Sequence, residues 1–364
     1  MTASRPRRIG ISLGNLGNLQ DGLGEFAVQM GTVLATAAPR WAERDQLHID
    51  FHLRAEHVGL FGSNVGYLPV SRWHRWRHLQ PRHYDLWHSL HQLNKNKPPV
   101  GSGQRLVTVH DLNYAHGPGG WSGWRHQRRT QALMARTDLV VAISQHTASD
   151  VRKHLGWTGP IEVILRGARP FADSPQDPLP GWPAAPPGST KPFLFHLSRM
   201  SPSKNPQAIL GLAREWPDMS FVFSGPDGGD TRALRDATAL PNVQFHLNIS
   251  DAQKAWAFAH CAGFLFPSLA EGFGLPPIEA MQFGKPVFLS RLTSLPEIGG
   301  DAADYFDDFS PGAMRAVVER SLARQLSEPG RAAAIRAHAG RFDADRAAAK
   351  YLALYRRLLR LPVD

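Results

Sequence analysis

Short apolar segments alternate with helix-like segments along this chain, and that alternation most constrains its fold. Each apolar segment has the length of a buried strand, and the stretches between them repeat apolar residues at helical spacing. Strands joined by helices pair in parallel, so the pattern predicts an α/β protein with parallel sheets. The predicted strands are 8–13, 106–109, 139–143, 193–197, 221–224, 243–247, 264–267 and 287–290, with helices over 26–34, 124–136 and 344–361.

One proline-rich stretch interrupts this series. Proline fixes φ and removes a backbone donor, so a segment this rich in it is expected to be a linker. The prediction is an N-terminal α/β domain over 1–170, a linker over 171–190, a C-terminal α/β domain over 191–343, and a helix over 344–364 that packs back towards the N-terminal domain. The seven prolines are Pro170, Pro175, Pro178, Pro180, Pro183, Pro186 and Pro187.

Composition agrees with two globular domains. The chain has 364 residues and 42% hydrophobic residues, which is enough for each domain to bury a core. No apolar run approaches the roughly 18 residues that a membrane-spanning helix needs, and residues 9–13 are too short for a signal-peptide core. The single cysteine, Cys261, excludes an internal disulfide and is expected to be inert core. A cytoplasmic protein is the expectation.

Charge is divided unevenly along the chain. Residues 1–172 hold 21 Lys and Arg against 11 Asp and Glu, whereas residues 173–364 hold 20 against 20. The first part also holds 13 of the 17 histidines. A basic excess confined to one half predicts an anionic partner there, and membrane phospholipid, a lipid diphosphate and a nucleic acid would each fit.

The segment 264–281 joins a predicted strand to a predicted helix through a glycine-containing loop. Gly272 and Gly274 follow the strand, the proline pair at 276–277 suits the first helical turn, and Gly284 suits the helix end. Glycines let backbone N–H groups approach a ligand closely, and a helix N-terminus carries partial positive charge. The segment therefore predicts a phosphate site.

Two carboxylates flank that loop. Glu271 lies on the loop and Glu279 is expected in the first helical turn, so that one could bind sugar hydroxyls and the other a ribose. The plain alternative is a capped helix with a flexible glycine loop and two surface glutamates.

A second loop carries two cations. Arg199 and Lys204 follow the predicted strand 193–197, and Asn205 and Pro206 are typical of a helix N-cap and first helical residue. Cations at the carboxyl end of a parallel strand can neutralise a diphosphate. Taken alone, the loop could equally be a solvated basic surface.

Together these segments resemble the motif of the family 4 retaining glycosyltransferases. Two glutamates, Glu271 and Glu279, enclose Gly-Phe-Gly, and the match continues through Gly-Lys-Pro-Val from Gly284 and Ser-Leu-Pro-Glu from Ser294. The spacing of Arg199 and Lys204 is similar to that family's diphosphate-binding pair. The resemblance implies the GT-B fold, an α/β protein with two Rossmann-like domains facing across a cleft, in which residues 191–343 bind the nucleotide sugar.

The resemblance also implies a role for each matching residue. The two cations and the helix amides would hold the leaving diphosphate, Glu271 and the glycine loop the sugar, and Glu279 the ribose. Glu271 and His110, at the end of the strand 106–109, are the residues expected to act on the sugar. Donor-binding roles are implied for Arg199, Lys204, Asn248, Ile249, Gly272, Phe273, Gly274, Leu275 and Glu279.

The N-terminal half adds features whose roles stay open. Gly22 and Gly24 resemble the family's glycine-rich first loop and would contact either donor or acceptor. Arg166 departs from the family, which usually has a small polar residue before the following glycine. Residues 40–100 match no family feature, and acceptor specificity is expected there.

No metal is expected at the donor site, and no cofactor. The Asp343-Ala-Asp345 triplet directly precedes a predicted helix, which is typical of capping aspartates. The histidine pairs His74/His78 and His88/His91 have ligand-like spacing, but no cysteine or carboxylate cluster accompanies them. We expect surface or interface histidines.

Rival functions remain for the basic half. The Arg-Trp-His-Arg-Trp-Arg-His run at 72–78 could stack and neutralise a single-stranded nucleic acid, although it belongs to no recognised binding module. An interfacial segment on anionic lipid fits it better. A GT-B epimerase or phosphorylase is the other rival.

The predicted function is hexose transfer with retention, without a metal, from a GDP- or UDP-linked sugar. Mannose is the first expectation for the sugar. The acceptor would be a glycan or lipid-linked precursor of a cell-surface polysaccharide or lipopolysaccharide, and no nucleic acid would bind. Peripheral attachment to the inner face of the plasma membrane follows from the basic half.

Overall fold

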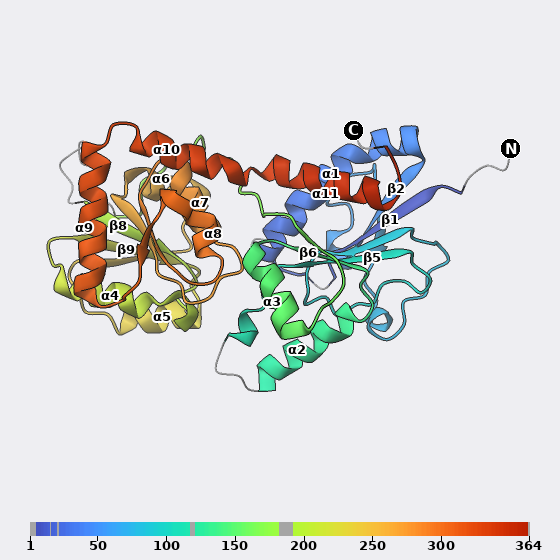
Figure 1. Cartoon of the computed structure of the whole chain (residues 1–364), viewed down its shortest axis with the longest axis horizontal. Coiled ribbons are helices and arrows are strands. Elements are labelled where there is room, and N and C mark those ends of the chain that lie inside the picture. Colours follow the sequence, from blue (N-terminus) through green and yellow to red (C-terminus); the bar gives the residue numbers. More distant parts are fainter. Residues whose placement is uncertain (1–4, 15, 20–21, 117–120, 182–191, 363–364) are drawn as a thin grey trace. The chain divides into compact units, whose positions relative to one another are not determined.

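The computed structural model divides the chain into two compact units, and each is described by itself (Figure 1). Unit 1 comprises residues 1–167 and 345–364, and unit 2 comprises residues 168–344. The structure describes residues 5–14, 16–19, 22–116, 121–181 and 192–362.

Unit 1 is built on a seven-stranded parallel sheet with the order β3-β2-β1-β4-β5-β6-β7. Its first strand lies inside the sheet, and the chain winds outwards from it in one direction and then in the other. This is the doubly wound arrangement in which ligands bind at the carboxyl ends of the strands beside the switch of direction. The strands are β1 Arg7–Ser12, β2 Leu47–Leu53, β3 Gly66–Pro69, β4 Leu86–Ser89, β5 Gln104–Val109, β6 Leu139–Ala142 and β7 Ile161–Val163.

Helices connect these strands and bury apolar side chains against them. Phe26, Met30 and Leu34 recur at helical spacing and are buried in the same core as Ile9 and Ile11 of β1. The helices of unit 1 are α1 Gly22–Asp45, α2 Trp121–Met134, α3 Gln145–Leu155 and α11 Ala344–Leu358, with short 3₁₀ turns η1 Ala55–His57, η2 Arg72–Arg75 and η3 Asn113–Ala115.

The last helix of the chain belongs to the core of unit 1. Tyr351 and Tyr355 of α11 are buried beside the sheet, and the Tyr355 hydroxyl lies 2.6 Å from Nδ1 of His88. Arg356 is 1% exposed and pairs with Asp45 at 2.7 Å. The C-terminal segment thus supplies both apolar packing and a buried ion pair to a sheet formed by the start of the chain.

Unit 2 repeats the doubly wound pattern with six parallel strands in the order β10-β9-β8-β11-β12-β13. Its first strand, β8, lies next to β11, so the direction of winding switches between these two strands. The strands are β8 Phe193–Leu197, β9 Ser220–Gly225, β10 Val243–Leu247, β11 Gly263–Phe266, β12 Val287–Ser290 and β13 Asp304–Phe306.

Seven helices accompany this sheet in the described part of unit 2. They are α4 Pro206–Glu215, α5 Gly229–Asp236, α6 Asp251–His260, α7 Leu275–Gln282, α8 Leu295–Gly299, α9 Pro311–Ser327 and α10 Arg331–Ala339, with 3₁₀ turns η4 Pro202–Lys204, η5 Gly300–Ala302 and η6 Gly340–Phe342. The core combines phenylalanines of the strands with aliphatic residues of α4 and α9, such as Ile209 and Val318. Two parallel α/β sheets confirm the predicted fold class.

The predicted linker differs from the structure over its described part. Residues 171–181 are counted with unit 2, where Phe171 and Leu179 are each 1% exposed. The backbone N–H of Phe171 donates to the Gln282 side chain at 2.7 Å. Burial of these apolar side chains holds the segment on unit 2 in spite of its prolines. Pro183, Pro186 and Pro187 lie outside the described residues.

Candidate functional site

The switch of direction in unit 2 brings together the two loops that the motifs predict. Lys204 ends the 3₁₀ turn after β8, Glu271 follows β11, and Lys204 Nζ lies 2.6 Å from Glu271 Oε1. Both side chains are largely buried but keep some exposure, 19% for Lys204 and 11% for Glu271. A cation and a carboxylate at the carboxyl edge of adjacent strands can bind phosphate and hydroxyl groups of one ligand.

The glycine loop has the geometry expected at a helix N-terminus. Gly274 is the N-cap of α7 with φ +116°, a conformation that side-chain-bearing residues rarely adopt, and the proline pair begins the helix. Its missing side chain and the helix dipole leave backbone amides suited to an anion. Gly272, Phe273 and Gly274 are all buried, and Leu275 is the first residue of α7.

Two hydroxyl side chains support this loop: Ser294, which begins the Ser-Leu-Pro-Glu match, and Thr293 directly before it. Ser294 donates to the backbone oxygens of Glu271, at 3.2 Å, and of Phe273, at 2.8 Å. Thr293 Oγ1 accepts from the backbone N–H of Glu271 at 3.1 Å. The Ser-Leu-Pro-Glu segment that resembles the family therefore orients the loop on which Glu271 lies.

Glu279 lies in the second turn of α7, and its placement in the first turn is wrong. The helix begins at Leu275, before the proline pair, which moves Glu279 one turn inwards. The carboxylate is 8% exposed and lies 3.2 Å from Nζ of Lys254 on α6. Lys254 was missed because nothing in its local sequence relates it to Glu279.

The remaining donor-site predictions lie on neighbouring strand ends of unit 2. Arg199 follows β8 and is exposed, and Asn248 and Ile249 form the turn between β10 and α6. The Asn248 side chain accepts from the backbone N–H of Asp227 at 2.9 Å, which ties this turn to the loop after β9. All predicted residues of unit 2 therefore gather at one edge of its sheet.

Asn205 and Pro206 take the predicted positions, the N-cap and the first residue of α4. The backbone of Asn205 is left-handed with φ 53°, however, and its side chain makes no capping bond. A side-chain cap requires an extended backbone at that position. Asparagine is here because it tolerates the left-handed conformation at the end of the Lys204 turn.

In unit 1, the corresponding strand ends lie at β1 and β4. Ser12 Oγ accepts from the Asn94 side chain at 2.8 Å, and Gly14, with φ +60°, leaves no space for a side chain beside Asn94. Gly22 and Gly24 lie in the first turn of α1. A Cβ at Gly24 would meet backbone atoms of residues 18 and 19, so glycine is required there by close packing.

His110 follows β5 and is 3% exposed. Its Nε2 lies 2.8 Å from the Leu90 carbonyl oxygen, to which it donates, and its Nδ1 is buried without a hydrogen-bond partner among the described residues. Burial, followed by the nearby charge of Arg166, lowers the pKa of His110 to about 3, so the ring is neutral. The ring edge packs on Phe26 at 4.8 Å, and His110 therefore presents little of itself to solvent.

Arg166 lies beside the same group of residues. Its guanidinium is 5.9 Å from the ring centre of Phe26, and a Cβ at Gly22 would lie 3.5 Å from its Nη1. Nη2 is 4.0 Å from a carboxylate oxygen of Glu25. The departure from the family thus puts a largely buried cation next to His110 and the glycine-rich start of α1.

The histidine pairs are buried, so their prediction as surface or interface residues is wrong. His74 and His78 are 8% and 0% exposed, and His88 and His91 are 0% and 5% exposed. Hydrogen bonds compensate for their burial. His78 Nδ1 donates to the Lys97 carbonyl at 3.0 Å, and His91 Nε2 donates to the Leu13 carbonyl at 3.1 Å.

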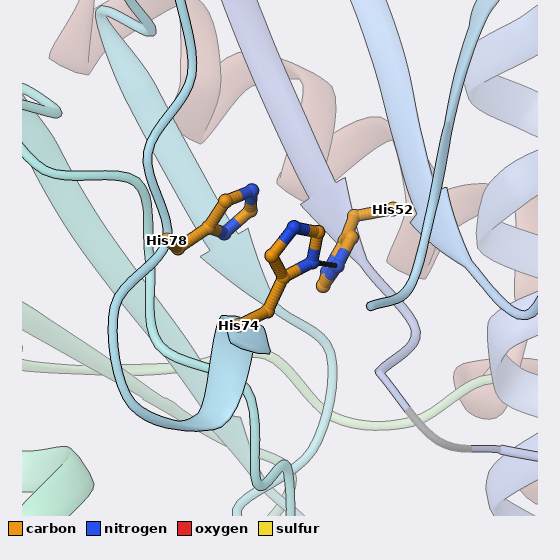
Figure 2. A group of neighbouring side chains, drawn as sticks. All are labelled: His52, His74 and His78. Carbon is orange, nitrogen blue, oxygen red and sulfur yellow. Dashed lines mark hydrogen bonds between the residues drawn. The ribbon is translucent and has the colours of Figure 1, made fainter. Parts of the chain in front are cut away.

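His52 joins His74 and His78 in a buried group, shown in Figure 2. His52 Nε2 lies 2.9 Å from His74 Nδ1, which also accepts from the Ser71 N–H at 3.2 Å. The His74 and His78 rings are stacked at 3.8 Å with an angle of 17° between their planes. A nitrogen lone pair lies in its ring plane, so two stacked parallel rings cannot both point at one metal ion. The group is a neutral network that anchors the 3₁₀ turn η2.

The residues that flank His74 and His78 in the sequence face outwards. Trp73 is 62% exposed and Trp76 is 76% exposed, and the side chains of Arg72, Arg75 and Arg77 are exposed beside them. The Arg72 guanidinium lies 5.0 Å from the Trp73 ring centre. We call these five residues the Trp–Arg patch. Cys261, by contrast, is buried, and burial raises the pKa of its thiol to about 12.

Two family models match the chain. The model described as Glycosyltransferase Family 4 matches residues 23–170, and the model described as Glycosyl transferases group 1 matches residues 184–328. Between them the two matches cover most of both units.

Curated relatives include mannosyltransferases of Escherichia coli. The chain is 34% identical over 139 residues to O-antigen chain mannosyltransferase B of Escherichia coli, covering 36% of each chain. It is 25% identical over 309 residues to D-inositol 3-phosphate glycosyltransferase of Mycobacterium avium, covering 77% of this chain and 71% of the other. The chain spans about a third or less of the first mannosyltransferases that it matches, with 36% and 17% of their lengths covered.

Solved structures share the fold of the whole chain. Sucrose-phosphate synthase from Thermosynechococcus elongatus has a TM-score of 0.71 at 17% identity, with 97% of this chain and 99% of that chain covered. Anabaena Alr3699/HepE, solved in complex with UDP and glucose, has a TM-score of 0.67 at 17% identity, with 96% and 98% covered.

Proposed function

Since this chain belongs to glycosyltransferase family 4, of the GT-B type, we propose that it transfers a hexose from a nucleoside diphosphate sugar to a glycan or lipid-linked acceptor. The observation that carries the proposal is the Lys204–Glu271 pair beside the glycine loop that begins α7. One ligand that offers both phosphate and hydroxyl groups fits this pair and the amides next to it.

The donor chemistry divides among the residues of unit 2. Arg199, Lys204 and the amides of Gly274 and Leu275 hold the leaving diphosphate. Glu271 and the loop backbone accept and donate hydrogen bonds to the sugar, and Glu279, held by Lys254, binds the ribose. The Asn248–Ile249 turn borders the base. Charge developing on the diphosphate is stabilised by fixed cations and dipoles, so no metal is needed for the transfer.

Retention at the anomeric carbon is part of the proposal, as is a positioning role for His110. A neutral ring whose Nε2 is held by the Leu90 carbonyl offers Nδ1 as an acceptor only. Such a group orients a sugar hydroxyl and does not compete for the proton of the acceptor. Arg166 would add a cation to the same edge of unit 1.

Mannose, delivered by GDP-mannose, is the proposed sugar, and cell-surface polysaccharide or lipopolysaccharide the proposed product. The names of the relatives support this choice, since several are mannosyltransferases of Escherichia coli and one is an O-antigen chain enzyme. Conversion of GDP-mannose in preference to UDP-glucose is the corresponding expectation.

We further propose reversible attachment to the inner face of the plasma membrane through the Trp–Arg patch. Exposed tryptophans suit the headgroup level of a bilayer, and arginines suit anionic lipid. No helix among the described residues has the length and apolar character to span a bilayer. Attachment would therefore depend on this patch and on the basic excess of the N-terminal half.

A ligand screen tests the donor proposal. Purified protein is heated with UDP, GDP, the matching nucleosides, several nucleotide sugars and a single-stranded oligonucleotide, and the melting temperature is recorded. We expect one nucleoside diphosphate to raise it by several degrees and the oligonucleotide to leave it unchanged. Stabilisation by the oligonucleotide alone would contradict the proposal. An NMR measurement of the product's anomeric configuration then decides between retention and inversion.

A further inference from the structure

Three histidines of unit 1 direct a ring nitrogen at one carboxylate. His146, Asp150 and His154 are spaced four residues apart on α3, so they lie along one face of that helix. His116 reaches the same face from the end of the 3₁₀ turn η3, after β5. No local sequence pattern indicates this group, because its members lie on two segments and belong to no recognised ligand motif.

The nitrogens lie at ligand-like distances from the carboxylate. His116 Nε2 is 2.6 Å and His146 Nε2 is 3.4 Å from Asp150 Oδ2, and His154 Nε2 is 3.7 Å from Asp150 Oδ1. The ligand atoms of His116, His146 and Asp150 all lie within 4.8 Å of one another. A tetrahedral zinc ion, about 2.0–2.2 Å from each ligand, holds its ligand atoms roughly 3.3 Å apart. The distances of His116 and His146 from Asp150 Oδ2 lie on either side of that value, and His154 lies at the edge of the group, 3.7 Å from Asp150 Oδ1.

Ion pairing alone accounts poorly for this arrangement. His154 Nε2 is buried and has no hydrogen-bond partner among the described residues, since 3.7 Å is too long for a bond to Asp150. A single carboxylate can balance one imidazolium, so three protonated rings around it would repel one another. A cation placed between neutral rings and the carboxylate would satisfy all four side chains at once.

The ring orientations allow convergence on one ion, in contrast with the buried group of Figure 2. The His116 and His146 ring centres are 5.6 Å apart at 30°, and those of His116 and His154 are 5.3 Å apart at 77°. None of these pairs is stacked, whereas His74 and His78 are stacked at 3.8 Å. Ring planes separated in this way can pass through a common point.

We propose that His116, His146, His154 and Asp150 bind one Zn²⁺ ion. Three imidazole nitrogens and one carboxylate oxygen are a ligand set that zinc accepts, and four protein ligands leave no open position for catalysis. Asp150 is 7% exposed in its side chain, and the three histidines are 24–27% exposed, so the ion can enter from solvent.

Such an ion would tie the segment that begins with His110 to α3. His116 ends the segment that follows β5, and the Thr147 hydroxyl on α3 already donates to the His110 carbonyl at 3.3 Å. Zinc would add a second, stronger connection at the far end of the same segment. The site is structural and is distinct from the proposed donor site of unit 2.

The test uses the full chain without an affinity tag, because a histidine tag binds zinc itself. Zinc binding is measured by calorimetry and the bound metal by elemental analysis, for wild type, the double variant His146→Gln/His154→Gln and the control His83→Gln. His83 is 39% exposed and lies outside the group. We expect one zinc per chain, the same affinity in the control, and a loss on the order of a hundredfold or more in the double variant.

Two further measurements keep the test decisive if the double variant folds poorly. Cobalt should give wild type the intense visible bands of tetrahedral coordination, and zinc should protect His116, His146 and His154 from chemical modification detected by mass spectrometry. Wild type that takes up no zinc overturns the proposal. Protection at His52 and His78 in place of these three residues overturns it as well.

Discussion

Unit 1 and unit 2 have the same strand order at the centre of their sheets but different side chains at the strand ends. In unit 2 the segments that follow the strands carry two ion pairs, Lys204–Glu271 between two loops and Lys254–Glu279 between α6 and α7. In unit 1 the strand ends carry buried neutral histidines, among them His52 and His110. Unit 2 therefore places charged pairs at this edge of its sheet, whereas unit 1 uses neutral hydrogen bonds to hold its loops.

The comparison indicates that one strand order can support two kinds of chemistry at the strand ends, accessible charge and neutral hydrogen bonding. A diphosphate requires fixed charge that remains accessible, and paired residues with some exposure provide it. Loops expected to recognise an acceptor require a rigid base, and a satisfied polar network provides one. Such a network is also sensitive to acid, because protonation of its histidines disrupts it.

Replacement of Glu271 by alanine should reduce transfer the most. The variant removes a proposed sugar contact and leaves Lys204 without its carboxylate, so we expect a loss in kcat/KM on the order of a hundredfold or more. Glu319→Ala, at an exposed pair on α9, is the matched control and should keep full activity. Near-normal turnover of Glu271→Ala would remove this residue from the site.

Replacement of Lys204 by alanine should weaken nucleoside diphosphate binding by roughly tenfold or more, with a smaller effect on the nucleoside, because the partner of the cation is phosphate. Calorimetry with both ligands measures the difference. Lys350→Ala, an exposed lysine of α11, serves as the control. Equal losses for both ligands would show that Lys204 acts only by supporting the loop.

Acid should destabilise unit 1 more steeply than unit 2. Burial lowers the pKa of His52 to about 2, of His88 and His110 to about 3, and of His78 to about 4, whereas in unit 2 the largest such shift takes His196 to about 4. Unfolded histidines bind protons below about pH 6.5 while these native ones do not. Their stabilising contribution is therefore complete above pH 6.5 and decreases as the pH falls towards the native values.

Hydrogen exchange measured peptide by peptide between pH 6.5 and 5 can follow the two units separately, since carboxylates stay largely ionised in this range. We expect opening free energies in unit 1 to fall with pH faster than those in unit 2. The same slope in both units would contradict a special role for the buried histidines.

Loss of the Trp–Arg patch should weaken membrane attachment by several-fold. The triple variant Arg72→Ser, Arg75→Ser and Arg77→Ser removes three exposed cations, whose attraction to an anionic surface is partly screened by salt. Co-sedimentation with anionic and neutral vesicles at low and high salt measures the effect. Serine at Arg214, Arg235 and Arg320, exposed in unit 2, changes the charge equally and should leave attachment unchanged. Absence of wild-type binding at low salt would reject attachment.

Chelation should have the smallest effect, with turnover unchanged in excess EDTA at a temperature well below unfolding. In the proposed mechanism, Arg199 and Lys204 neutralise the diphosphate in place of a metal ion. Activity lost on chelation and restored by Mg²⁺ or Mn²⁺ would contradict this mechanism. Restoration by Zn²⁺ alone would instead indicate the group around Asp150.

Local sequence was sufficient to predict the bounds of several strands, including strands that contain polar residues such as His196 of β8 and His246 of β10. The segments that became β8, β10 and β12 were predicted with the bounds that the structure has. β2 was missed although its seven residues alternate between apolar and polar positions, the pattern of a half-buried strand. That pattern would leave the polar residues exposed, as His48 is, whereas Asp50 and His52 are buried and depend on distant partners, such as the Tyr84 hydroxyl that donates to Asp50.

The same limit applies to the site. Glu271 and Lys204 could be named from motifs because each stands in a recognisable loop. The roles of Lys254 and Ser294 could not be predicted in this way, because they depend on contacts with residues more than 20 positions away. From the sequence, Arg166 stands out only as a departure from the family pattern. Its position next to Phe26 can be known only from the folded structure.

The C-terminal helix α11 has a consequence for synthesis. When the ribosome has made residues 1–344, every residue of unit 2 is available, but unit 1 still lacks the helix that brings Tyr351, Tyr355 and Arg356 into its core. The unit that is translated first is therefore the last that can be completed. Until residues 345–364 are synthesised, His88 lacks the Tyr355 hydroxyl and Asp45 lacks Arg356. The nascent chain then exposes the part of the unit 1 sheet that α11 covers, which chaperones can bind.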